Sequence, residues 1–301
     1  MKKQKLAAIL IIAGLVAVFL FLFYGPFEGF RLLWINTAMY SSRHQFLATA
    51  LYPRSYIDKV LALPLPQEQT DLQPPPENNS SAVSFTELRG EYFRGYMLKI
   101  DDPRRLTLVS SAHSEGEYLE DMVESVQGLG GVNGGGFEDH EMRGIPWGML
   151  IVNGELAFPC TKHRLHSIGG MTSSHKLVVG RMDGKEITEK DFLWAFEFGP
   201  ILLINGEKTV LNQYTGGIAP RTAIGQTKEG RIILVVIDGR QSSSLGAYLH
   251  DVQTIMYENG AVNAISLDGG ASSCMVYRGE LVNSPSEGKR GRLIPNAVVF
   301  R

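Results

Sequence analysis

The apolar positions of the chain begin with one long uninterrupted run. Residues 6–24 carry no charged side chain and are nearly all apolar, and Lys2, Lys3 and Lys5 precede them. A helix of this length, rising about 1.5 Å per residue, nearly matches the hydrocarbon core of a bilayer. The positive-inside rule then keeps the N-terminus in the cytoplasm. The pattern predicts a single-pass anchor with the rest of the chain outside the cytoplasm. A cleaved signal peptide is the alternative, although its apolar region is usually shorter, at about 7 to 15 residues.

Between the anchor and residue 63, apolar and polar residues mix in a way that suits short juxtamembrane helices interrupted at Pro53. Residues 64–76 then hold five prolines among Gln, Glu and Asn. Such a stretch cannot bury a core and favours extended polyproline conformations. The sequence therefore predicts four parts: a cytoplasmic tip and anchor (1–25), a juxtamembrane segment (26–63), a Pro-rich linker (64–81) and one folded domain (82–301).

Within the folded domain, the dominant pattern is of short apolar runs bounded by turn residues, which is the signal of β-strands. The best helix spans residues 245–258, where apolar residues recur at helical spacing, with Ser242 to Ser244 as an N-cap and Gly260 as a stop. A less periodic helix is expected at 117–127. Many strands with few helices predict an α+β fold, a mixed and strand-rich single domain. The expected strands are residues 92–100, 106–110, 148–152, 177–179, 201–204, 232–237 and 264–267.

Charge and cysteine content narrow the function. The formal net charge is -2, with 29 Lys plus Arg against 31 Asp plus Glu, so the chain lacks the basic character of a nucleic-acid binder. Cys160 and Cys274 are too few for a disulfide framework, and no CxxC spacing indicates zinc. Two buried thiols are the preferred interpretation, while an exported location would also permit a disulfide.

Two segments with candidate chemistry follow apolar runs. In the glycine-rich loop at residues 131–137, Gly134 and Gly135 let backbone N–H groups converge, and Asn133 adds an amide. Such a concavity suits an anion or a sugar hydroxyl, and a flexible loop is the alternative. Arg221 and Thr222 begin a strand that continues to a hairpin turn at residues 228–230. The planar fork of an arginine matches a phosphate or a carboxylate, and a solvated surface arginine is the alternative.

Two apolar strands each end in Asp-Gly. Residues 232–237 precede Asp238-Gly-Arg, and residues 264–267 precede Asp268-Gly-Gly. The helix between them predicts a strand-helix-strand unit, which places both strands in one sheet and both carboxylates at the same end, where open sheets bind ligands. Paired carboxylates are the usual equipment for cleaving a glycosidic bond. A turn-forming role explains either Asp alone, but explains the pair less well.

The order and spacing of these segments, over about residues 84–301, resemble those of the phosphodiester glycosidase family, which has bacterial members described as exopolysaccharide-related. The N-terminal anchor also looks like that of anchored bacterial members. One departure is Gly136 followed by Phe137, where the family often has two aromatic residues after the glycines. The matching segments are residues 133–137, 199–200, 221–225, 238–240 and 268–273, with Asn283.

The resemblance implies a hydrolase that cleaves the glycosidic bond of a sugar-1-phosphodiester, such as an N-acetylglucosamine-1-phosphodiester. On this basis Asp268 is the leading nucleophile or base, Asp238 the second carboxylate or orienting group, and Arg221 the phosphate clamp. Whether the reaction is retaining or inverting stays open, since it depends on the carboxyl separation. The expected substrate-binding residues are Asn133, Gly134, Gly135, Thr222, Arg240, Gly269, Gly270, Ser272, Ser273 and Asn283.

No metal or other cofactor is expected. His163 and His166 lack a third ligand at known spacing, and the acidic cluster at residues 138–141 is typical of a solvated loop, although it would suit a calcium ion. The expected partners are a carbohydrate phosphodiester or envelope polymer and, through the N-terminal helix, the membrane. The alternatives are a non-catalytic polysaccharide-binding or assembly protein and a metal-dependent phosphodiesterase.

Overall fold

The computed structural model describes residues 2–39, 45–60, 82–140, 143–159, 166–209, 211 and 216–301. The expected Pro-rich linker, Cys160, His163 and Glu141 lie outside these residues. The chain divides into two compact units, residues 1–62 with 214–216, and residues 63–213 with 217–301. The predicted four-part division of the chain stays a prediction.

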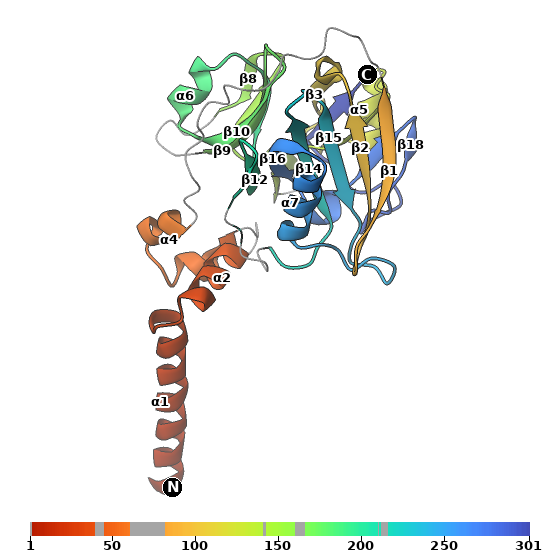
Figure 1. Ribbon diagram of the computed structural model, residues 1–301. Coiled ribbons are helices and arrows are strands. Elements are labelled where there is room, and N and C mark those ends of the chain that lie inside the picture. Colours follow the sequence, from red (N-terminus) through yellow and green to blue (C-terminus); the bar gives the residue numbers. More distant parts are fainter. Residues whose placement is uncertain are drawn as a thin grey trace. The chain divides into compact units, whose positions relative to one another are not determined.

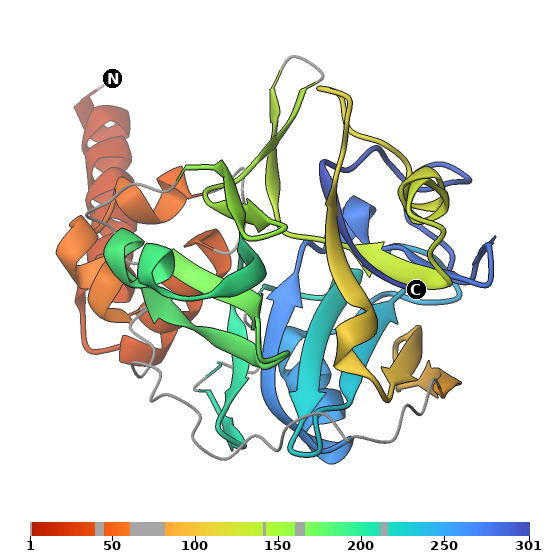
Figure 2. The same ribbon diagram turned by 90° about the horizontal axis from the view of Figure 1, so that it is seen from above.

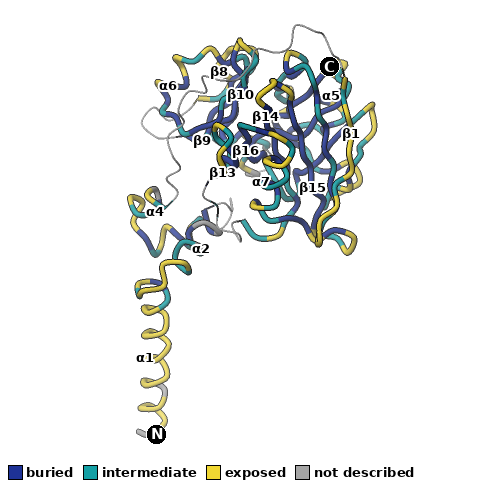
Figure 3. Tube along the Cα trace, viewed as in Figure 1, coloured by how far each residue is buried: buried dark blue, intermediate teal, exposed yellow. Residues whose placement is uncertain are grey.

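The N-terminal unit consists of one long helix and three short ones. Most residues of α1 (Lys2–Tyr24; Figure 1) are exposed (Figure 3), although Phe23 near its end is buried, and residues Gln4–Tyr24 have a mean hydropathy of 3.1. By length and composition this helix can cross a membrane, as an anchor or as a signal sequence. Ile35, Ala48 and Ile57 are fully buried among the short helices. These helices are α2 (Glu28–Met39), α3 (Phe46–Thr49) and α4 (Arg54–Val60).

The second unit is built on a seven-stranded sheet in the order β1-β2-β15-β14-β16-β12-β13. β15 is buried along its whole length, which explains why its sequence is a continuous apolar run and does not alternate. The strands are β1 (Val83–Arg89), β2 (Arg94–Ile100), β12 (Ile201–Ile204), β13 (Glu207–Lys208), β14 (Arg221–Thr227), β15 (Ile232–Ile237) and β16 (Ala261–Leu267).

Two five-stranded sheets share the main core with this central sheet. Their orders are β18-β17-β4-β19-β3 and β10-β9-β11-β7-β8, and a two-stranded pair, β5-β6, stands apart. Their bounds are β3 (Leu106–Ser110), β4 (Gly130–Asn133), β5 (Phe137–His140), β6 (Arg143–Pro146), β7 (Leu150–Val152), β8 (Glu155–Phe158), β9 (His166–Thr172), β10 (Leu177–Met182), β11 (Phe192–Glu197), β17 (Met275–Tyr277), β18 (Glu280–Leu281) and β19 (Asn296–Phe300).

The central sheet lies between a helix on one face and strands on the other. On one face, Val252 and Met256 of α7 (Leu249–Glu258) pack against Val235. On the opposite face, Leu234 shares a core with Val298 of β19. Figure 2 shows α7 behind the central strands, with β3 and β4 in front. The other helical segments are η1 (Pro103–Arg105), α5 (Leu119–Ser125), α6 (Gly184–Glu189) and η2 (Gly270–Ser272).

This strand-rich architecture with few helices confirms the predicted α+β fold. The predicted start of the main helix is wrong, because α7 begins at Leu249 and Ser242 to Ser244 do not cap it. The hydroxyl of Ser244 instead donates to the carbonyl of Asp238, at 2.7 Å. Serine side chains compete with helical hydrogen bonds in this way, and here they hold a turn.

Candidate active site

Both Asp-Gly strand ends lie at one edge of the central sheet. β14 pairs antiparallel with β15 on one side and with β16 on the other, so β15 and β16 run parallel and end together. Arg221 lies opposite Ile237, and Thr222 lies opposite Leu267. Arg221 at the start of β14 is therefore placed between the two strand ends that lead into Asp238 and Asp268.

The backbone of Asp268 is fixed by the glycine-rich loop. Its N–H donates to the carbonyl of Gly134 at 3.0 Å, and its carbonyl accepts from Nδ2 of Asn133 at 2.7 Å. Burial raises the pKa of the Asp268 carboxyl to about 6, against the opposing hydrogen bonds from Ser272 and the Gly269 backbone and the positive charge of Arg292. A carboxyl with a pKa near neutrality can both accept and release a proton under physiological conditions.

Asp238 is held in a different way. Only 5% of its surface is exposed, and its Oδ1 accepts from Nδ2 of Asn283 at 2.9 Å and from the N–H of Ser284 at 3.0 Å. Burial raises the pKa of Asp238, while these two hydrogen bonds act to lower it. Asp238 therefore links the end of β15 to the segment after β18, through its hydrogen bonds with Asn283 and Ser284.

Asn133 links the end of β4 to β14 and to the segment between β16 and β17. Besides its bond to Asp268, its Oδ1 accepts from Oγ1 of Thr222 at 2.8 Å and from the N–H of Cys274 at 3.2 Å. Asn133 and Thr222 are 1% and 0% exposed, so both side chains are enclosed in the protein. Asn133 holds the backbone of Asp268, and Thr222 holds Asn133, so both act as positioning residues in this structure.

The glycine-rich loop is tied to β19. The N–H of Gly134 donates to the carbonyl of Asn296 at 2.9 Å, and the N–H of Gly135 donates to its Oδ1 at 2.8 Å. A Cβ on Gly134 would lie 1.9 Å from that same Oδ1. These glycines allow a close approach between loop and strand, and both of their N–H groups are used within the protein.

Arginine side chains surround the Asp268-Gly-Gly turn. Arg221 donates from Nε to the carbonyl of Ala247 at 3.1 Å, and a Cβ on Gly269 would lie 3.9 Å from its Nη1. A Cβ on Gly270 would lie 3.1 Å from Nη2 of Arg240. Burial lowers the pKa of Arg221 to about 10, and the charge of Arg240 acts in the same direction. Arg221 and Arg240 repel each other, and the two glycines beside them have no side chains to fill the space. This arrangement is suited to bind an anion.

Arg292 is a site residue that the sequence pattern did not reveal. Its guanidinium lies 4.6 Å from the centre of the Phe137 ring, and its charge acts on Asp268. It belongs to the charged run at residues 287–292, which has the composition of a solvated loop. Only the fold brings this loop to the end of β16.

Two serines complete the turn after Asp268. Ser272 and Ser273 are 1% and 2% exposed, and Ser272 hydrogen-bonds Asp268. The hydroxyl of Ser273 has no hydrogen-bond partner among the described residues. Within the same described part of the chain, no group of three or more His, Cys, Asp or Glu side chains is placed to hold a metal ion. His166 instead pairs with Glu197, at 2.6 Å between Nδ1 and Oε2.

The sequence of the second unit matches the model of a known protein family. The family model described as phosphodiester glycosidase matches residues 128–301, more than half of the chain. The chain is a member of the phosphodiester glycosidase family. The matched range contains all of the candidate site residues named above, from the glycine-rich loop to the strand ends.

Relatives and solved structures agree with this family. The bovine N-acetylglucosamine-1-phosphodiester alpha-N-acetylglucosaminidase is 28% identical over 149 residues, or 41% of this chain and 28% of the relative. The mouse enzyme of the same name is 23% identical over 259 residues, or 73% of this chain and 48% of the relative. The chain thus spans less than half the length of these relatives. The catalytic domain of the zebrafish enzyme has the same fold, with a TM-score of 0.62, 23% identity, and coverage of 80% of this chain and 87% of that one.

Proposed function

We propose that this phosphodiester glycosidase family member hydrolyses the bond between the anomeric carbon of a sugar and a phosphodiester oxygen. The observation that carries the proposal is the carboxyl of Asp268, with a pKa of about 6, at a strand end shared with Arg221 and Arg240. A carboxylate on a turn flanked by cations suits a reaction in which positive charge develops on the sugar and negative charge leaves with the phosphate. N-acetylglucosamine is the first sugar to test, because the relatives are named for it.

Each residue has a task in this reaction. Arg221 and Arg240 hold the phosphate and stabilise the charge that it gains when the C–O bond breaks. Asp268 acts on the other side of that bond, either by removing a proton from the attacking water or by attacking the anomeric carbon itself. Water supplies a hydroxyl to the sugar, and its remaining proton is released to the solvent or the phosphate. Because a phosphate monoester is a good leaving group, the reaction needs little help from a general acid.

The location belongs to the proposal as well. With α1 as an anchor and three lysines before residue 6, the catalytic unit faces outward, toward cell-envelope or exopolysaccharide polymers. Phosphodiester-linked polymers of this kind carry the proposed bond. Digestion of the second unit by a protease added to intact cells would support this topology. Resistance of that unit to the protease until the cells are opened would contradict it.

Hydrolysis in water enriched in oxygen-18 tests the reaction class. The full chain in detergent is incubated with an N-acetylglucosamine-1-phosphodiester, and the products are analysed by mass spectrometry. Cleavage of the C–O bond places the label in the free sugar, whereas a phosphodiesterase that cleaves the P–O bond places it in phosphate. If oxygen-18 enters the phosphate, and a chelator abolishes this labelling, the result would favour the metal-dependent phosphodiesterase. If a folded chain gives no product, the result would favour a non-catalytic binding protein.

The pH dependence of turnover tests the role of Asp268. If the ionised carboxylate is the base or nucleophile, kcat/KM is expected to rise with pH and to level off above about 6, because burial places the pKa of Asp268 there. The diester phosphate is ionised throughout this range and does not titrate. Activity that falls as the pH rises through 6 would instead assign Asp268 the role of a proton donor.

A further inference from the structure

Two aromatic side chains, Trp147 and Phe198, pack against the glycine-rich loop and are called the aromatic pair below. Trp147 follows β6 and Phe198 follows β11, and their rings meet edge to face with centroids 6.4 Å apart. The N–H of Trp147 donates to the carbonyl of Gly136 at 2.8 Å. A Cβ on Gly136 would lie 2.4 Å from the Phe198 ring and 3.5 Å from the Trp147 ring. The absence of a side chain at Gly136 therefore lets both rings approach the loop.

The aromatic pair differs from the aromatic residues of the core. Trp194 and Phe196 of β11 are 2% and 1% exposed, whereas Trp147 and Phe198 are only half-buried. Within the described residues, the indole N–H of Trp147 makes no hydrogen bond, and neither does the half-buried hydroxyl of Ser167. The backbone of Ser167 is adjacent, because its carbonyl accepts the N–H of Phe198 at 3.0 Å. Partly exposed rings with a few polar groups beside them are the usual lining of a site for a small organic molecule.

Two backbone hydrogen bonds place the aromatic pair beside the end of β16. The carbonyl of Gly134 accepts the N–H of Asp268 at 3.0 Å, and the loop meets the two rings two residues further along. The carbonyl of Pro200 accepts the N–H of Ser266 at 3.0 Å, and Phe198 is two residues before Pro200. Two residues span about 7 Å at most. The aromatic pair therefore lies close to Asp268, at a distance that one sugar ring can span.

The aromatic pair and the arginines lie on opposite sides of the Asp268 turn. In the sheet order β14-β16-β12, Arg221 begins β14 and Phe198 precedes β12. The two sides also differ in the face of the sheet. Ala223, two residues after Arg221, packs with α7, whereas Phe198 packs against the core cluster that contains Leu267. A substrate that contacts both groups must therefore cross the turn on which Asp268 lies.

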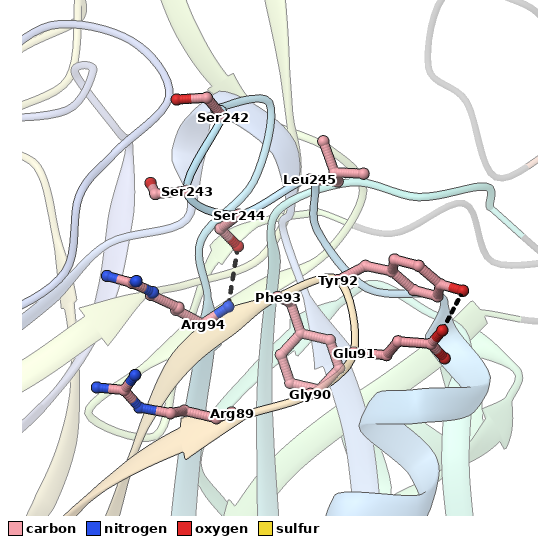
Figure 4. Close-up of a pocket in the computed structure, with 10 residues that line it drawn as sticks. All are labelled: Arg89, Gly90, Glu91, Tyr92, Phe93, Arg94, Ser242, Ser243, Ser244 and Leu245. Atoms are coloured by element: carbon pink, nitrogen blue, oxygen red, sulfur yellow. Dashed lines mark hydrogen bonds between the residues drawn. The ribbon is translucent and has the colours of Figure 1, made fainter.

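The arginine side of the turn is held in place by its own contacts. The N–H of Arg240 donates to the carbonyl of Leu245 at 3.1 Å. Figure 4 shows that Oγ of Ser244, in the same segment, accepts the N–H of Arg94 at 3.0 Å, which fixes this segment to β2. One side of the turn thus offers cations, and the other offers aromatic rings. The charged and the apolar parts of a sugar phosphodiester match these two sides.

We propose that Trp147 and Phe198, with the hydroxyl of Ser167, bind the sugar ring of the substrate. A pyranose presents C–H groups to the rings and hydroxyl groups to the polar atoms beside them. The anomeric carbon then lies at Asp268, and the phosphate extends toward the two arginines. This inference rests on the proposed function, because it assigns a place to the sugar of the diester. It makes the ends of β6 and β11 the elements that select the sugar.

Competitive inhibitors test this division of the site. The full chain in detergent hydrolyses an N-acetylglucosamine-1-phosphodiester in the presence of either free N-acetylglucosamine or inorganic phosphate. Trp147→Ala is expected to weaken inhibition by the sugar about tenfold and to leave inhibition by phosphate unchanged. Arg221→Gln should do the reverse. Unchanged inhibition by the sugar in Trp147→Ala, or an equal loss for both inhibitors, would overturn the inference.

Tyr257→Ala is the matched control for the loss of an exposed aromatic ring. Tyr257 lies on α7, where its ring centre is 4.9 Å from Nζ of Lys208, and its replacement should leave both inhibitors unaffected. If Trp147→Ala does not fold, Phe198→Leu decides the matter. Leucine keeps an apolar side chain at this position but lacks the ring, so inhibition by the sugar alone should weaken. Parent-like inhibition by the sugar in that variant would contradict the proposal.

Tryptophan fluorescence separates this inference from the proposed function, because it needs no turnover. Of the three tryptophans, Trp194 is 2% exposed and Trp34 belongs to the N-terminal unit, so a bound sugar should change the emission of Trp147. N-acetylglucosamine should alter the emission of the parent, and Trp147→Phe should not respond. A response without hydrolysis of any diester would support the sugar site and contradict the proposed function. Hydrolysis without a response would leave the proposed function intact and overturn the sugar site.

Discussion

Replacing Asp268 by Asn is expected to lower kcat/KM for a sugar-1-phosphodiester by about 10²- to 10⁴-fold, the range for loss of a group that transfers a proton. The amide keeps the shape of the side chain and can still pair with Ser272, but it cannot remove a proton from water or attack a carbon. The backbone bonds to Gly134 and Asn133 do not involve the side chain and are kept. The measurement is the initial rate of sugar release, taken at a saturating substrate concentration for kcat and at a concentration well below KM for kcat/KM.

Asp101→Asn is the control for a carboxylate lost elsewhere in the same sheet. Asp101 pairs with Arg231 at the far end of β2, and its replacement should leave kcat/KM unchanged. Asp238→Asn is a useful contrast, since Asp238 is engaged by Asn283 and Ser284 and its change should lower stability. Turnover in Asp268→Asn equal to that of the parent would remove Asp268 from the mechanism.

The stability of Asp268→Asn should depend on pH in a specific direction. Burial places the folded pKa of Asp268 at about 6, above its ordinary value of 3.8, so the protonated form is favoured by folding. This contribution is present below pH 4 and is lost as the pH rises through 6. A neutral Asn avoids that loss, so at pH 8 the variant should exceed the parent in unfolding free energy by about 1–3 kcal/mol. The two proteins should unfold alike near pH 4, and lower stability of the variant at pH 8 would contradict the buried position.

The sequence was most informative where strands have both faces buried. β12 and β15 begin and end at the expected residues, because continuous apolar runs bounded by turn residues leave few alternatives. The strand-helix-strand pattern also placed Asp238 and Asp268 at one edge of the sheet. The hairpin turn at residues 228–230 predicted the neighbour of β15, but not that the same strand β14 also pairs with β16, because that pairing joins segments far apart in the sequence and leaves no local signal.

Side-chain roles were harder to predict than side-chain positions. Asn133 looked like a ligand because it follows a strand and precedes three glycines, but its amide is occupied by Thr222, Cys274 and Asp268. Those partners lie far away in sequence, so only the folded chain shows that the amide is used. Arg292 was missed for the converse reason, because its loop has the composition of solvent-exposed surface.

Replacing Gly134 by Ala is expected to destabilise the second unit by about 2–5 kcal/mol and to abolish most activity. The new Cβ would lie 1.9 Å from Oδ1 and 2.9 Å from the backbone oxygen of Asn296, and a backbone oxygen in a paired strand cannot move aside cheaply. Displacing Asn296 would also leave the buried N–H of Gly135 without its acceptor. Thermal unfolding should shift downward by about 5–15 °C.

Activity should be lost in Gly134→Ala even in the fraction that stays folded, because the carbonyl of Gly134 accepts the N–H of Asp268 at 3.0 Å. A shift of the loop therefore moves Asp268 relative to the arginines that flank its turn, and a small misplacement of a reacting group is costly. Gly144→Ala is the matched control, since a Cβ there has its first neighbour at an ordinary 3.4 Å. Its unfolding temperature and kcat/KM should be near those of the parent. Wild-type stability in Gly134→Ala would mean that loop and strand do not approach as closely as this geometry requires, and that Asp268 is held by other contacts.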